Sequence, residues 1–524
     1  MSWRSRTWLV CATVLLLGSA GAAAQQGAPV GAAGNAPSPK EQASALIQAG
    51  DCAKALDLLQ GALAKSPQDL DLLELKVRAL MGLRQYKEAA NFSWGLAVAH
   101  LDRPWFREAA GLSAFRFGAF DPALKAWKVL SQTPGWEATG YENGVQSLAA
   151  LGREAEALAM LHAGLERVHP PAQSLVADSL DLEPSAKVSL AALDAYRKAD
   201  PKAPAFYQDM RQVYAALGDV TLCRCDGLSG PSVRIPLQEK SERQEVPTVS
   251  SDASGQVSSW TEMSTGASVT VPVVVDGGSK SWMTLDSGSD TFLIPEELAD
   301  ELKLQPLGSV SYRGLGPKAA RSAMVLLKAV QIGPLTFHDV PAVVIPKKAD
   351  FWARRGLVPL SLLKSFALLY DRRHSRLDVY PSGTDPAPLL GKGGFRVPSL
   401  WFSGEPYVLM RIQEAVGLYC LLDTGAAEAY ISGEHAPEVG VKVNSGKWGS
   451  ERGLGVTGAF TSGQAEQVTL GLGLANFHLS PIQVMPLGLD RPLLPVYGIV
   501  GRKILDPFVI FFDYPRNVIA FKAY

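Results

Sequence analysis

The sequence has no excess of charge of either sign and few residues that favour fibrous or disordered chains. Its 524 residues include 50 Lys and Arg against 51 Asp and Glu, which gives a net charge of −1. A nucleic-acid-binding protein presents a basic excess or a basic stripe, so we expect no nucleic-acid partner. Gly (49) and Pro (35) are too few for a fibrous chain, and a hydrophobic share of 47% predicts buried cores.

Several sequence patterns that carry catalytic or cofactor chemistry are missing. The seven histidines show no HExxH motif or paired ligand spacing, and no CxxCH motif occurs, so we expect neither a metal nor covalent haem. There is also no GxSxG nucleophile elbow and no GxxxxGK[ST] phosphate loop. These absences predict a protein without cofactors and argue against serine-hydrolase or nucleotide chemistry.

A single apolar run stands out, and it lies at the N-terminus. Arg4 and Arg6 precede the apolar stretch Trp8 to Leu17, and small residues follow as far as Ala24. This order predicts a cleavable signal peptide over residues 1–24, cut after Ala24. The run is too short to cross a bilayer, which needs about 20 apolar residues. We therefore expect a periplasmic or secreted protein with no stable membrane insertion after cleavage.

Four cysteines remain once the signal is removed: Cys52, Cys223, Cys225 and Cys420. An oxidising compartment permits disulfides, but four cysteines allow three pairings and the sequence does not select one. Cys223 and Cys225 form a CxC pair without a nearby histidine. The sequence therefore favours a structural disulfide or free thiols over a zinc site.

The first half repeats with a period of 34 residues after a Gly/Ala/Pro-rich tether (25–40). Four alanines recur at this spacing, and a Gly or an Arg lies five residues before each of them. The alanines are Ala55, Ala89, Ala123 and Ala157, and the preceding residues are Gly50, Arg84, Gly118 and Gly152. Ala191 is a fifth, weaker match. A small residue lets two helices approach closely, and the glycine opens the turn before the second helix.

This pattern resembles tetratricopeptide repeats over residues 41–222, in which each repeat is a pair of antiparallel helices. One pair cannot bury its apolar face alone, so successive pairs stack into a solenoid. The resemblance implies either a surface for a protein partner or a helical spacer. A linker (223–230) follows.

The second half reads as a duplicated β lobe. A predicted β-hairpin leads into Asp286, and a second one leads into Asp423, 137 residues later. Each copy closes with an apolar run that ends in an aspartate, Asp371 or Asp513, and a final β run follows. We place lobe 1 at residues 231–384 and lobe 2 at residues 385–524.

The duplicated motif resembles that of retropepsin-like aspartic proteases of bacterial type, here with two lobes fused in one chain. The resemblance implies an all-β two-lobed fold behind the all-α solenoid, and a catalytic pair of Asp286 and Asp423. Two carboxylates held close share one proton, so that one can act as base on a water and the other as acid. The supporting motif residues would be Ser287, Gly288, Ser289, Thr424, Gly425 and Ala426, with Ser289 able to bond its aspartate.

The family's second marker is an apolar pair followed by glycine. Lobe 2 has it at residues 499–501, whereas lobe 1 has Pro359 where lobe 2 has Gly501. Proline lacks an N–H and cannot adopt positive φ, so we expect lobe 1 to pack differently around its motif. Two hypotheses stay open: an endopeptidase acting on a protein or peptide, and a catalytically inactive two-lobed peptide-binding protein.

The resemblance to aspartic proteases implies a flap in each lobe, and two glycine-rich segments are the candidates. The candidates are Tyr312, Gly314 and Gly316 in lobe 1, and Gly453 and Gly455 in lobe 2. The second segment matches GxGxxG, but no βαβ unit surrounds it, so a dinucleotide site is not expected. Lobe 1 also carries an insertion before its motif, and we predict a solvated loop at its polar stretch, residues 238–245. The insertion is either a disordered segment or one that shapes substrate access.

Overall fold

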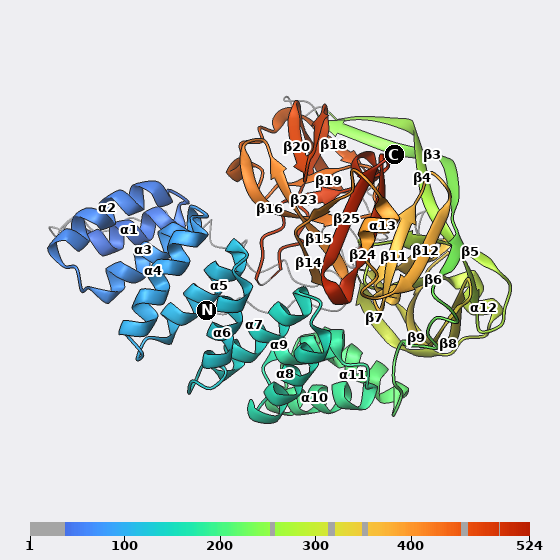
Figure 1. Cartoon of the computed structure of the whole chain (residues 1–524), viewed down its shortest axis with the longest axis horizontal. Helices are drawn as coiled ribbons and strands as arrows, with labels where there is room; N and C mark the ends of the chain where they lie inside the picture. The colour runs from blue at the N-terminus through green and yellow to red at the C-terminus, as the bar shows by residue number, and fades with distance from the viewer. Residues whose placement is uncertain (1–36, 252–256, 313–319, 348–354, 452–459, 492) are drawn as a thin grey trace. The chain divides into compact units, whose positions relative to one another are not determined.

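The computed structural model describes residues 37–251, 257–312, 320–347, 355–451, 460–491 and 493–524. The predicted signal peptide and most of the predicted tether lie outside these ranges. The described chain forms two compact units, one of helices up to Ser147 and one from Leu148 to Tyr524. The division falls inside helix α7, so helices α8–α11 belong to the same unit as the strands (Figure 1). Across these ranges we find no helix with the length and apolarity needed to span a membrane.

Helices occupy the first part of the described chain, as the periodicity predicts. They are α1 (Pro39–Gln48), α2 (Cys52–Lys65), α3 (Leu70–Gly82), α4 (Tyr86–Ala99), α5 (Pro104–Phe117), α6 (Phe120–Leu130), α7 (Glu137–Ala150), α8 (Glu154–Arg167), α9 (Gln173–Leu182), α10 (Ala186–Ala199) and α11 (Ala205–Leu217). Helices α2, α4, α6 and α8 begin at residues 52, 86, 120 and 154, which are 34 residues apart. The all-α fold of this region is therefore confirmed, while its tetratricopeptide type stays a prediction.

The turns before these four helices share one backbone conformation. Gly50, Arg84, Gly118 and Gly152 all have positive φ, between 58° and 89°, where glycine is favoured because it has no Cβ. The four recurring alanines are fully buried. Ala191 does not extend the series, because it is exposed and its neighbour is buried instead.

Lobe 1 consists of short strands with a long hairpin near its start. Its elements are β2 (Val233–Pro236), β3 (Gln238–Ser251), β4 (Val257–Val275), β5 (Ser281–Asp286), β6 (Phe292–Pro295), α12 (Glu296–Glu301), β7 (Pro306–Tyr312), β8 (Ala320–Ile332), β9 (Leu335–Ile345), β10 (Leu357–Pro359), η2 (Leu360–Leu363), β11 (Phe366–Asp371) and β12 (Arg376–Pro381). A two-residue strand, β1 (Arg224–Cys225), pairs with β9.

Lobe 2 repeats this order with shorter hairpins. Its elements are α13 (Pro386–Leu390), β13 (Phe395–Val397), β14 (Ser399–Phe402), β15 (Glu405–Ile412), β16 (Ala415–Leu422), β17 (Tyr430–Ser432), η3 (Pro437–Val439), β18 (Asn444–Glu451), β19 (Phe460–Ala465), β20 (Val468–Leu472), β21 (Ala475–Leu479), β22 (Ile482–Met485), β23 (Gly498–Val500), α14 (Arg502–Leu505), β24 (Phe508–Asp513), η4 (Tyr514–Arg516) and β25 (Val518–Ala523). The predicted all-β two-lobed architecture is confirmed.

A six-stranded antiparallel sheet joins the two lobes, in the order β13-β25-β24-β11-β12-β2 (Figure 1). Each lobe supplies three strands, and the central pair is β11 with β24. These two strands are the closing runs identified from the sequence, and Leu368 lies opposite Phe512. The sheet fixes the lobes as one body, which is what a site at their junction requires.

The solvated loop predicted at residues 238–245 is wrong, because these residues lie in β3, which pairs with β4 along its whole length. Their polar sequence has no alternating apolar face, so the usual signal for a strand is missing. The four cysteines are free thiols, which decides between the alternatives left open for Cys223 and Cys225.

Candidate active site

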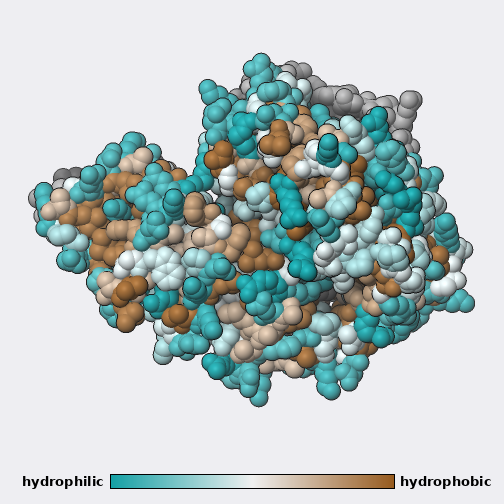
Figure 2. All heavy atoms as spheres, viewed as in Figure 1, coloured by the Kyte–Doolittle hydropathy of each residue, from teal (hydrophilic) through white to brown (hydrophobic). Residues whose placement is uncertain are grey.

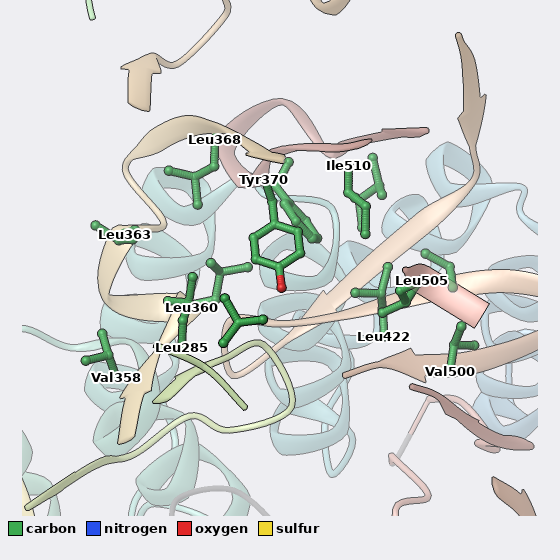
Figure 3. Packing of buried hydrophobic residues seen from close by; sticks show 14 of the residues in the cluster. Leu285, Val358, Leu360, Leu363, Leu368, Tyr370, Leu422, Val500, Leu505 and Ile510 are labelled. Atoms are coloured by element: carbon green, nitrogen blue, oxygen red, sulfur yellow. The ribbon is translucent and has the colours of Figure 1, made fainter. Parts of the chain in front are cut away.

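Asp286 ends strand β5 and Asp423 follows strand β16, and each of these strands is supported by a parallel neighbour. Strand β10 pairs with β5, with Val358 opposite Leu285, and β23 pairs with β16, with Val500 opposite Leu422. Figure 3 shows these side chains in two groups, one from each lobe, with Tyr370 between them. The backbone of each aspartate is therefore held in place by closely packed apolar side chains beneath it.

Reciprocal hydrogen bonds connect the two aspartate loops across the lobe junction. The Ser287 N–H donates to Thr424 Oγ1 (3.1 Å), and the Thr424 N–H donates to Ser287 Oγ (2.9 Å). Each hydroxyl then donates to a carbonyl of the opposite lobe, at Leu422 (2.7 Å) and Leu285 (3.3 Å). All four groups are satisfied in a buried place, so the contact fixes the spacing of the loops.

Two glycines leave room for the carboxyl groups at the centre. A Cβ on Gly288 would lie 2.4 Å from Asp423 Cγ, and a Cβ on Gly425 would lie 2.5 Å from Asp286 Oδ2. Each glycine therefore packs against the aspartate of the opposite lobe. The two carboxyl groups are hydrogen-bonded to each other, so the structure brings together the pair that the sequence singled out.

The two carboxyl groups differ in their backbone donors. Asp286 Oδ1 accepts from the Gly288 N–H (2.7 Å). Asp423 Oδ1 accepts from the N–H groups of both Gly425 and Ala426 (2.8 Å each). The Ser289 hydroxyl is not bonded to the Asp286 carboxylate as expected: it donates to the Thr291 carbonyl and accepts from the Thr291 N–H.

The environment shifts the pKa of both aspartates. Burial and the neighbouring charge of Asp423 raise the pKa of Asp286 well above its usual value. Burial also raises the pKa of Asp423, but the donors at Ala426 and Gly425, the bond from Asp286 and the charge of Arg502 oppose that rise. Asp423 is thus the better site for the negative charge, and Asp286 is the better site for a shared proton.

The lobes pack differently at Pro359 and Gly501, as expected, but a positive φ is not the reason. Pro359 has φ −69° and lies opposite Asp286 in the parallel pair β10–β5. Gly501 has φ −90°, so neither position needs positive φ, and proline suits the lobe 1 position. Glycine is needed at 501 for another reason, because a Cβ there would lie 1.8 Å from the Glu428 carbonyl oxygen.

The flap candidates are only partly described. Gly314, Gly316, Gly453 and Gly455 lie outside the described residues. Tyr312 ends β7 and is 6% exposed. It lies in a hydrophobic cluster that strands β7–β9 form with helices α9–α11, so it acts as a core residue here and not as an exposed flap aromatic.

A buried charged cluster near the pair was missed from the sequence. Arg491 Nε donates to Tyr407 Oη (2.9 Å), and Arg491 is also ion-paired with Glu405. Burial raises the pKa of both Glu405 and Asp181, and the negative charge of Asp290, four residues after Asp286, adds to the rise.

Asp181 brings the end of helix α9 to this cluster, since its Oδ2 accepts from Ser403 Oγ (3.0 Å) at the β14–β15 turn. Burial raises the pKa of Asp181 to about 7 and that of Glu405 to about 8. No local pattern links residues that are 222 positions apart, so the sequence offered no signal for this contact. Within the described ranges, no group of three or more His, Cys, Asp or Glu side chains is placed to hold a metal ion.

Comparisons with known proteins agree with the motif. Residues 271–363, which include the Asp286 loop, match the family model described as aspartyl protease. The chain is also similar to the aspartic proteinase from Irpex lacteus, with 10% identity over 55% of this chain and 97% of that chain, at a TM-score of 0.30. A TM-score this low carries no argument. A comparison with curated proteins gives no match. The family match confirms the predicted resemblance to aspartic proteases.

Proposed function

We propose that the chain is an aspartic endopeptidase that hydrolyses peptide bonds of a protein or peptide substrate. The observation that carries this proposal is the hydrogen-bonded pair of Asp286 and Asp423 at the lobe junction. The Ser287–Thr424 contact supports it, because the contact holds the pair in one geometry. Such a pair shares one proton and can activate a water without a covalent intermediate.

The unequal environments support a division of roles within the pair. Asp423 is the ionised base, which takes a proton as the water oxygen adds to the scissile carbonyl carbon. Asp286 is the acid, which gives its proton to the carbonyl oxygen. Collapse of the resulting diol breaks the C–N bond, and the leaving nitrogen takes up a proton. The products are a carboxylic acid and an amine.

The Asp423→Asn variant tests this function. It should reduce cleavage of an unfolded protein by at least about 10³-fold, since the base is lost. Asp219→Asn, at an exposed side chain, is the matched control and should cleave at the wild-type rate. Unchanged cleavage by Asp423→Asn would contradict the aspartate mechanism. A wild-type protein that binds peptides but cleaves none would favour the alternative, a catalytically inactive peptide-binding protein.

We also propose that the helical repeats recruit the substrate or a protein partner. Apolar side chains appear on the visible face of helices α1–α6 (Figure 2). Four large apolar residues between α4 and α6 are exposed: Val98 (69%), Leu101 (70%), Phe117 (51%) and Val129 (42%). Exposed apolar groups of this kind mark binding surfaces when they gather on one region.

A double variant, Val98→Ser with Leu101→Ser, should raise KM for a protein substrate by about fivefold, because contact residues at binding surfaces contribute on the order of 1 kcal/mol. Its kcat should not change. Val416→Ser, at an equally exposed apolar residue of lobe 2, is the control. Equal KM values for both variants would show that the repeats act as a spacer.

The proposed site of action is the periplasm or the outside of the cell. The charged start, apolar run and small residues before Ala24 support export. The mass of the exported chain tests this proposal, because cleavage after Ala24 predicts a chain that begins at Gln25. An exported chain that keeps its first 24 residues would contradict it.

A further inference from the structure

The insertion in lobe 1 forms a long hairpin that reaches lobe 2. We call β3 and β4 (Gln238–Ser251 and Val257–Val275) the bridge hairpin. Its base lies in lobe 1, where β4 pairs with β5 and β8. Its far end pairs with strand β18 of lobe 2, with Val249 opposite Ser450 and Ser250 opposite Gly449. At about 3.3 Å per residue, β3 spans roughly 43 Å.

Lobe 2 has a much shorter hairpin at the equivalent place. There, β14 and β15 are joined at Phe402 and Glu405 by a two-residue turn, Ser403-Gly404. In lobe 1 the residue at the same distance from the motif aspartate as Glu405 is Ser268, and Lys240 lies opposite it. The segment 241–267 is therefore an addition to the shared plan, and it is the part that reaches lobe 2. Figure 1 shows this hairpin in green beside β18.

The bridge hairpin gives the two lobes a second connection. The first connection is the six-stranded sheet, together with the Ser287–Thr424 contact beside the aspartates. Strand β18 belongs to the sheet that carries Asp423, through β19, β22, β17 and β23. The hydrogen-bonded strands therefore form a closed ring. It leads from the Asp286 loop through lobe 1 and the bridge hairpin into lobe 2, and it returns to the Asp423 loop, which contacts the Asp286 loop.

A closed ring restricts what reaches the lobe junction. An extended chain occupies about 4.8 Å in the plane of a sheet, whereas a helix with its side chains is about 10–12 Å wide. A single extended segment with a free end can thread through a ring. A loop whose two ends are anchored in a folded protein must pass two chain segments side by side, so it needs a wider opening, which the pairing of β3 with β18 restricts.

Resting on the proposed peptidase function, we propose that the bridge hairpin determines substrate specificity. It ties lobe 1 to β18, admits extended unfolded polypeptide to Asp286 and Asp423, and excludes segments held within folded proteins.

A shortened variant tests this directly. Residues 241–267 are replaced by Ser-Gly, the turn that lobe 2 uses between equivalent strands. Two substrates carry one cleavage sequence, found by profiling the wild-type protein on a peptide library. The first is a linear peptide, and the second presents the sequence in a surface loop of a folded carrier protein. Shortening should raise kcat/KM for the loop at least about tenfold, with the linear peptide little changed.

The possible outcomes separate the two proposals. If the wild-type protein cleaves neither substrate, the peptidase function is wrong. If it cleaves the linear peptide, but the ratio of the two kcat/KM values is the same in the shortened variant, the specificity proposal alone is wrong.

A cross-linked variant tests the same idea in a chain that keeps the whole hairpin. Ser250→Cys with Gly449→Cys, or Val249→Cys with Ser450→Cys, places a cysteine pair on directly opposed residues. One of two adjacent antiparallel pairs is of the non-hydrogen-bonded kind, where side chains are closer. The background carries Cys223→Ser and Cys225→Ser, since both native thiols are free and at least partly accessible.

Oxidation should abolish cleavage of a head-to-tail cyclic peptide and spare the linear peptide of the same sequence. Reduction should restore cleavage of the cyclic form. Equal ratios of cyclic to linear cleavage in the oxidised and reduced protein would overturn the specificity proposal.

Discussion

Asp286 in lobe 1 accepts one backbone hydrogen bond, whereas Asp423 in lobe 2 accepts two, although both follow equivalent strands. The second donor in lobe 2 is the Ala426 N–H. In lobe 1 the equivalent residue is Ser289, whose hydroxyl is engaged with Thr291. More donors stabilise the ionised form of a carboxyl group. A duplicated motif can therefore give two carboxyl groups different tasks through differences in backbone donors and in neighbouring charge.

The lobes differ more at their edges than at the aspartates. Lobe 1 carries the bridge hairpin and buries its strands β7–β9 against helices α9–α11. Lobe 2 has the short β14–β15 hairpin, whose turn meets Asp181 of α9. The Ser287–Thr424 contact and the two glycines are matched between the lobes. The comparison indicates that the residues at the lobe junction tolerate little change, whereas the segments at the edges of the lobes determine which substrates reach the aspartates.

The largest effect should come from breaking the part that the lobes share. Gly288→Ala and Gly425→Ala each place a Cβ within 2.4–2.5 Å of atoms of the opposite carboxyl group. Either change must push the aspartates apart, and a shift of about 1 Å can cost 10²-fold in rate. We expect kcat/KM to fall by at least about 10²-fold in both variants.

Gly230→Ala, at a glycine with open space around it, is the control for this experiment. Similar losses for the two motif glycines would support a symmetric junction. A normal rate in one of them would show that its lobe can move away from the pair.

The next effect concerns the base, and it sharpens the difference between the lobes. Arg502 lowers the pKa of Asp423, and the equivalent residue of lobe 1 is Leu360. Arg502→Gln should raise the pKa of Asp423. Activity needs ionised Asp423, so the loss of activity on the acid side of the pH profile would then occur at a higher pH. We expect the acid limb of the kcat/KM profile to move up by about one pH unit.

Arg502→Lys keeps the charge and should restore most of the wild-type pH profile. A shift of the acid limb to lower pH in Arg502→Gln, or no shift at all, would contradict Asp423 as the base. A shift confined to the alkaline limb would assign the base to Asp286 instead.

The sequence predicted the repeated and local features of this chain well, and for a physical reason. A 34-residue period, a strand that ends in Asp-Ser/Thr-Gly and a closing apolar run all depend on neighbouring residues. Contacts between distant segments left no such trace, as with Asp181 and Ser403. At Pro359 the expected difference between the lobes is present, but its cause is the close contact of Gly501 with the Glu428 carbonyl and not a positive φ. The strand β3 was missed because its polar residues show no apolar alternation.

The smallest effect tests a single atom in the shared sheet. Tyr370 lies in β11, and Phe512 holds the equivalent place in β24. The Tyr370 hydroxyl is buried and has no hydrogen-bond partner among the described residues, and Figure 3 shows it between the apolar groups of the two lobes. Removing an unsatisfied buried hydroxyl should stabilise the fold, so Tyr370→Phe should raise the free energy of unfolding by about 1 kcal/mol. Phe512→Tyr should lower it by a similar amount. Urea denaturation measures both, and a loss of stability in Tyr370→Phe would show that the hydroxyl finds a partner in solution.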